Sequence, residues 1–146
     1  MTLSQPRLFQ LASLTAGAGW LVLMALPLWT SGPLFVLGVA IVLLCVLYAL
    51  SLQQALTSRA EPGSGKPGFF TLKGVLALFR NPKAVLAAWV HILAFDLLAG
   101  LYIHQQGVAQ GMGHVWLLPC YVLAMLFGPL GLLLFLGLSQ LHAGIQ

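Results

Sequence analysis

Two polar side chains stand inside a long apolar run and are the first candidates for chemistry. The run 89–100 carries the imidazole of His91 and the carboxyl of Asp96. An ionisable side chain in membrane hydrocarbon costs roughly 3 kcal/mol on insertion scales, so such residues usually serve a function or pair within a buried polar network. We therefore treat Asp96 and His91 as candidate catalytic residues.

The spacing of these two residues limits what they can do together. At about 1.5 Å per residue, His91 lies about 10 Å and Asp96 about 18 Å into a membrane span that begins near residue 84. A five-residue offset places them about 140° apart around the helix, so a direct ion pair is not expected. In a structural role, His91 would bond to a helix carbonyl or to Thr15. Asp96 would donate to the carbonyl of Met125, which lacks its usual helical donor at proline 129.

Other residues are candidates for binding a ligand but not for catalysis. Aromatic side chains can line a ligand site, but they serve equally well in packing or at a membrane interface. The candidate ligand-binding residues are Trp89, Phe95, Trp20, Met125 and Pro129. A metal site is not expected, because zinc needs three or four converging ligands whereas His104 and His114 flank one loop and His142 follows another helix. No cofactor motif or phosphate-binding glycine loop is present in the sequence.

The composition indicates the elements that must position these residues. Of 146 residues, 60% are hydrophobic and 5% are charged, and no charge occurs between Arg7 and Arg59. Apolar tracts of this length are typical of membrane-spanning helices. We predict a single all-α membrane domain over residues 1–146, with four transmembrane helices in an antiparallel bundle. The expected spans are about 8–29, 33–52, 84–103 and 115–138, and the third is the expected centre of the bundle.

The segment 53–83 between the second and third spans is predicted to be a linker with a surface helix. A stretch rich in Gly, Pro and Ser opens it, which indicates flexibility. Apolar residues then recur at near-helical spacing, which predicts a short amphipathic helix on the membrane surface. These residues are Phe70, Leu72, Val75, Leu76 and Phe79. Asn81 and Pro82 form a typical helix start, so the third span should begin there.

The basic residues predict the orientation. Arg7 and the five basic residues of the linker fall on one side of four spans, whereas the opposite loops carry none. By the positive-inside rule, both termini are expected in the cytoplasm of what is predicted to be a bacterial inner membrane. The net charge of +4 then favours anionic lipid headgroups as partners and not nucleic acid.

Several motifs resemble the abscisic-acid-deficient-four-like membrane family. They are Asn81-Pro82, the run Trp89 to Leu97, His114, Pro119-Cys120 and the Phe127-Gly128-Pro129-Leu130-Gly131 segment, with Leu8-Phe9-Gln10 and Gly19-Trp20 near the start. The agreement covers most of the chain and is strongest from Asn81 to Leu133. The sequence departs from the family at Leu101 and at Gln105-Gln106, where members often carry a basic and then an acidic residue.

The resemblance implies a four-helix membrane protein connected with xanthophyll metabolism, since plant members are required for neoxanthin formation. On that basis His91 and Asp96 match the family's intramembrane histidine and aspartate. One hypothesis is an intramembrane isomerase that opens an epoxide on a carotenoid or another isoprenoid. The alternative is a non-catalytic lipid-binding or scaffold subunit of a membrane enzyme complex, with a membrane enzyme or a second copy as partner. A proton-coupled transporter is a weaker third hypothesis.

Overall fold

A computed structural model describes residues 3–25, 29–58 and 67–144. Within these residues the chain is helical and contains no strand. Four helices are long and apolar enough to cross a membrane, which confirms the predicted number and indicates a multi-pass membrane protein. They cover Gln5–Met24, Gly32–Leu56, Pro82–Ala109 and His114–Ala143. Residues 26–28 of the predicted first span and 59–66 of the linker lie outside the described residues.

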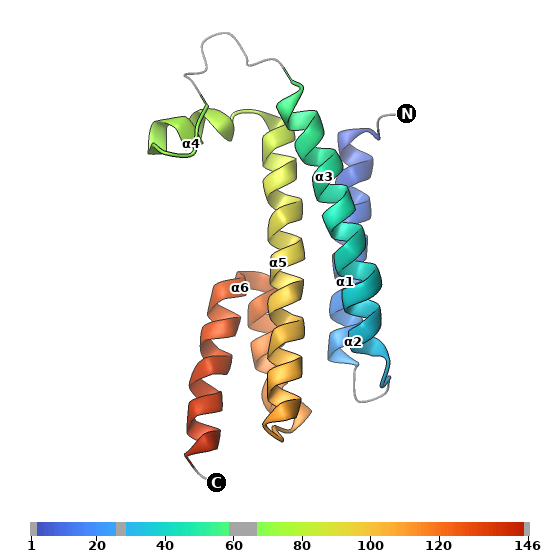
Figure 1. The fold of residues 1–146 in the computed structure, drawn as a ribbon, viewed down its shortest axis with the longest axis vertical. Coiled ribbons are helices and arrows are strands. Elements are labelled where there is room, and N and C mark those ends of the chain that lie inside the picture. The colour runs from blue at the N-terminus through green and yellow to red at the C-terminus, as the bar shows by residue number, and fades with distance from the viewer. Residues whose placement is uncertain (1–2, 26–28, 59–66, 145–146) are drawn as a thin grey trace.

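The first three spans run side by side along the long axis of the molecule (Figure 1). Helix α1 is Gln5–Met24, and the second span is built from α2 (Gly32–Phe35), the π-helical segment η2 (Val36–Ile41) and α3 (Val42–Leu56). Helix α5 covers Pro82–Ala109 and packs against α1, α3 and α6. The third span is therefore the centre of the helix packing, as predicted. Because α3 returns toward the start of α1, α1 and α5 run in the same direction.

The start of α5 follows from local chemistry. The side chain of Asn81 accepts a hydrogen bond from the backbone amide of Lys83 at 3.0 Å, and Pro82 occupies the first turn. Asn81 also donates to the hydroxyl of Ser58 at 2.7 Å, which ties this cap to the end of α3. At its other end α5 continues to Ala109, so most of the loop predicted from residue 104 is helical.

Helix α4, Leu72–Leu78, is the predicted short helix of the linker. Its first turn is capped by Thr71, whose hydroxyl accepts from the amide of Gly74 at 3.1 Å. It lies across the end of α5 and does not run alongside it (Figure 1).

Helix α6, His114–Ala143, differs from the predicted single span because the chain turns back inside it. Phe127 has non-helical angles, φ −147° and ψ 67°, and divides α6 into a first arm before it and a second arm after it. Pro129 favours a break just before it, because it has no amide hydrogen to donate to the Met125 carbonyl and its ring clashes with that carbonyl in a continuous helix. In Figure 1 the two arms lie side by side next to the second half of α5.

Contacts along the second half of α5 support this hairpin. Leu117 of the first arm meets Gly107, while Phe135 of the second arm packs edge-on against Tyr102 with ring centres 6.4 Å apart. The hydroxyl of Ser139 donates to the side chain of Gln110 at 2.7 Å. A straight α6 would carry Ser139 about 38 Å from its start, far from the end of α5. Both arms therefore cover the same half of the third span.

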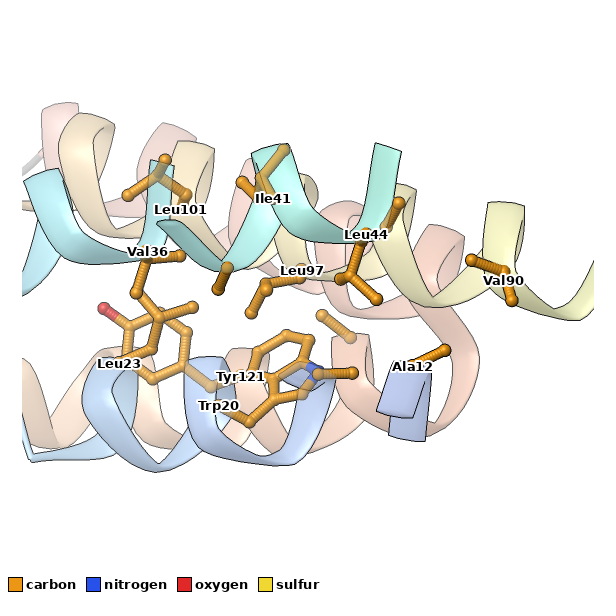
Figure 2. Packing of buried hydrophobic residues seen from close by; sticks show 14 of the residues in the cluster. Ala12, Trp20, Leu23, Val36, Ile41, Leu44, Val90, Leu97, Leu101 and Tyr121 are labelled. Carbon is orange, nitrogen blue, oxygen red and sulfur yellow. The ribbon is translucent and has the colours of Figure 1, made fainter. Parts of the chain in front are cut away.

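The core is formed where α1, α3, α5 and the first arm of α6 meet (Figure 2). Leu97 of α5, Trp20 and Leu23 of α1 and Tyr121 of α6 all belong to this buried cluster. All four side chains are buried. Small residues permit this approach: a Cβ atom at Gly100 would lie only 2.6 Å from the Trp20 ring.

Candidate functional site

Asp96 lies at the tip of the α6 hairpin. Its carboxyl group packs against the backbone of Gly128, where a Cβ atom would collide with it. Gly128 is the first residue after the break at Phe127, so the carboxyl is next to the start of the second arm. The free amides and the dipole at a helix start favour an acceptor or an anion there. The predicted hydrogen bond from Asp96 to the Met125 carbonyl is not formed among the described residues.

His91 faces a different part of the molecule. Its ring lies 4.5 Å from the ring of Phe95 and 5.4 Å from that of Tyr48 on α3, measured between centroids. It therefore contacts α3, whereas Asp96 contacts α6, as the predicted angular offset requires. The structural role expected for His91 was a bond to a helix carbonyl or to Thr15, and among the described residues the ring contacts stand in place of either bond. Phe95, a candidate ligand residue, is exposed on the same outer surface as His91.

A hollow of about 730 Å³ lies between the first halves of α1 and α5. Its walls include Phe9 and Trp89, whose rings stack with centres 6.5 Å apart, and Val85 one turn before Trp89. The α6 hairpin reaches only as far as Asp96, so it leaves this half of the α1–α5 surface uncovered. A fourth helix that crossed completely would have continued along this surface.

A second hollow of about 590 Å³ lies along the second half of α1. Trp20 and Met125, both candidate ligand residues, are among its lining residues. Most of the Trp20 side chain is nevertheless in the core against Gly100, so only its edge is available. Gly17 also lines this hollow, and a Cβ atom built there meets no other atom within 4 Å. Pro129 is exposed near the hairpin tip and lines neither hollow.

The two hollows share one side of α1, and we call them together the α1 groove. Residues of both recur at intervals of three or four and so form a single stripe on the helix. The stripe consists of Pro6, Gln10, Ser13, Gly17, Leu21 and Met24. Its length is about 27 Å at 1.5 Å per residue, close to the roughly 30 Å hydrocarbon core of a membrane. The groove is therefore long, and its lining is almost entirely apolar.

Asp96 belongs to the same side of α5 as the first hollow. It follows Trp89 by seven residues, which is nearly two complete turns and about 10 Å along the helix. The wall formed by Val85 and Trp89 thus leads toward the carboxyl at the hairpin tip. His91 points about 140° away from Asp96, toward α3, and is not part of this wall.

A polar cluster at the far end of α5 was not predicted as a site. The Nδ1 atom of His104 lies 3.1 Å from the hydroxyl of Tyr121, which is fully buried. His114 donates from Nε2 to the carbonyl of Met24 at 3.0 Å, at the end of the α1 groove. The seven-residue spacing of His114 and Tyr121 puts them on one side of a helix and was the signal available in the sequence. Among the described residues, no three His, Cys, Asp or Glu side chains are grouped so as to hold a metal ion.

Comparison with known proteins gives one match. The family model described as ABA DEFICIENT 4-like matches residues 7–135, which include all of the α1 groove except Gln5 and Pro6 at its start, and the turn of the α6 hairpin. Neither a curated protein nor a solved structure matches the chain.

Proposed function

Because the chain belongs to the ABA DEFICIENT 4-like family, we propose that it binds an elongated, apolar isoprenoid lipid of the carotenoid kind in the α1 groove. The observation that carries this proposal is the α1 groove, two open apolar hollows that follow one another along one side of α1 over nearly the thickness of a membrane. A straight, rigid lipid loses little conformational freedom on binding along such a surface. Aromatic walls at Phe9 and Trp89 would contact its flat chain.

The separation of His91 from Asp96 favours binding over catalysis by this pair. An epoxide isomerase needs a proton donor at the oxygen and a base at a carbon of the same substrate. His91 contacts α3, while Asp96 lines neither hollow but lies on the same side of α5 as Trp89, about 10 Å further along the helix. A lipid in the α1 groove would reach only Asp96. In this proposal Asp96 donates a hydrogen bond to a polar atom of the lipid, and His91 takes no part.

A scaffold function for a partner membrane enzyme is the alternative. The α1 groove would then hold a helix of the partner or of a second copy. The uncovered side of α5, which the α6 hairpin does not reach, gives this alternative its support.

Substitution of Gly17 tests the proposal without disturbing the fold. A phenylalanine at this position projects into the second hollow, where no other atom lies within 4 Å of the Cβ site. Protein purified from its native membrane would be extracted, and its apolar small molecules identified by mass spectrometry. We expect an isoprenoid with the wild-type chain and a loss of about tenfold with Gly17→Phe, equivalent to about 1.4 kcal/mol of binding free energy.

The matched control is Gly137→Phe in the second arm of α6. Gly137 also has no other atom within 4 Å of its Cβ site but lines neither hollow. It should retain the lipid at the wild-type level. If all three proteins carry only bulk phospholipid while a partner protein is lost from Gly17→Phe alone, the scaffold alternative is correct and the lipid proposal is wrong.

A further inference from the structure

The segment 68–80 around α4 exposes an unusual set of large apolar side chains. Phe70 is fully exposed, and four more apolar residues are at least half exposed. These four are Phe69, Leu72, Leu76 and Phe79. Five such side chains within eleven residues form an exposed apolar patch of the kind that marks a protein or membrane contact.

The backbone of this segment is closed on itself. The amide of Gly68 donates to the carbonyl of Gly74 at 3.2 Å, and the amide of Gly74 donates to the Thr71 hydroxyl at 3.1 Å. A side chain at Gly74 would meet the carbonyl oxygen of Gly68 at 2.8 Å, so the closure depends on glycine there. The apolar side chains are therefore presented by a fixed turn and a short helix.

Basic residues accompany the apolar patch. Lys73 and Arg80 are exposed within the segment, and Lys83 follows in the first turn of α5. Among the described residues the only acidic one is Asp96, which lies about four turns into α5, about 20 Å along the helix from this end. A positively charged apolar surface is complementary to anionic headgroups lying above acyl chains.

We propose that the segment 68–80 docks on the membrane leaflet at the start of α5 and recognises its anionic phospholipids. Phe70 and its apolar neighbours enter the acyl boundary, and the cationic side chains of Lys73 and Arg80 bind lipid phosphates. The crosswise position of α4 at the end of α5 suits this arrangement, because a helix there can lie in the plane of the leaflet (Figure 1). The docking is independent of any lipid in the α1 groove.

A fluorescent label at position 70 tests this docking in the full chain. Cys45 and Cys120 are replaced by alanine, Phe70→Cys is labelled with an environment-sensitive dye, and the protein is reconstituted into phosphatidylcholine vesicles with or without phosphatidylglycerol. We expect the dye to be quenched by acyl-chain spin labels, shielded from aqueous iodide, and more deeply inserted with phosphatidylglycerol. Each of Lys73→Gln and Arg80→Gln should weaken the anionic preference about fivefold, equivalent to about 1 kcal/mol per charge.

Thr57→Cys provides the control, since Thr57 is exposed at the same end of the molecule but outside the segment. The fluorescence of a dye at this position should be quenched by aqueous iodide in both kinds of vesicle. The proposal is overturned if iodide quenches the dye at position 70 as strongly as the dye at position 57. It is also overturned if phosphatidylglycerol leaves the quenching by acyl-chain spin labels unchanged. Shielding from both quenchers would identify a protein surface as the occupant and would also contradict it.

Discussion

At the scale of single residues, glycines decide how closely the spans approach. Gly100 admits the indole of Trp20, and Gly19 admits the side chain of Leu97. A methyl group at either position would overlap atoms that already fill the core, and overpacking of this kind costs typically 1–3 kcal/mol.

We therefore expect Gly100→Ala to destabilise the protein by about 2 kcal/mol, because its Cβ would lie 2.6 Å from the Trp20 ring. Thermal unfolding in detergent, followed by the fluorescence of tryptophan, measures the change. Gly137→Ala is the control, since its Cβ meets no other atom within 4 Å. Equal stability of the two variants would show that the indole does not lie against Gly100.

The two intramembrane polar residues should also behave differently. Asp96→Leu keeps much of the volume of the side chain but removes the hydrogen-bond donor beside Gly128, so we expect the content of bound isoprenoid to fall severalfold. His91→Ala removes a ring that packs on Tyr48 and Phe95, away from the groove, and should leave that content unchanged. Mass spectrometry of extracted lipids compares the three proteins. A loss with His91→Ala but not with Asp96→Leu would reverse the proposed roles.

At the scale of elements, the turn inside α6 has the largest consequence. Each arm is about 20 to 24 Å long, less than the roughly 30 Å of a hydrocarbon core. Gly131 lets the arms touch, because a Cβ there would collide with the backbone of Ala124. The hairpin thus enters the helix packing from one end and stops near Asp96.

A cross-link between the second arm and α5 tests this hairpin. Gln110 and Ser139, which share a hydrogen bond, are replaced by cysteines in a protein without Cys45 and Cys120. We expect a short bifunctional thiol reagent to join them in the membrane, with a mobility shift on electrophoresis. The pair Gln110→Cys and Phe127→Cys is the control and should not react, since Phe127 is at the hairpin tip. Absence of cross-linking at 110 and 139 would indicate a straight α6.

At the scale of the whole molecule, the hairpin changes the expected topology. The start of α1 and the end of α6 lie at opposite ends of the long axis (Figure 1). The prediction that both termini are cytoplasmic assumed that the fourth helix crosses completely. With three crossings and a hairpin, we instead expect the end of α6 on the side opposite to Arg7 and the α4 segment.

Thiol labelling in oriented membranes checks this topology. Thr57 and Gly144 are both exposed. Single cysteines introduced at these two positions should react with a membrane-impermeant maleimide from opposite sides of the membrane. Inside-out and right-side-out vesicles provide the two directions of access. Labelling of both positions from the same side would show that α6 spans the membrane after all.

The sequence by itself determined the features that depend only on neighbouring residues, namely the number of long helices and the start of α5. Apolar length and scarce charge were sufficient for four helices of spanning length, and the Asn81-Pro82 pair set the start of α5 because a helix cap involves only neighbouring residues. The 140° offset of His91 and Asp96 was also readable, since helix geometry fixes it. Only the tertiary structure decided what each residue faces. Gly128 and Pro129 permit either a kink or a reversal of the helix. Which of the two occurs depends on the packing of Gly131 against Ala124 and of both arms against α5, and contacts between residues this far apart cannot be predicted from a local sequence pattern.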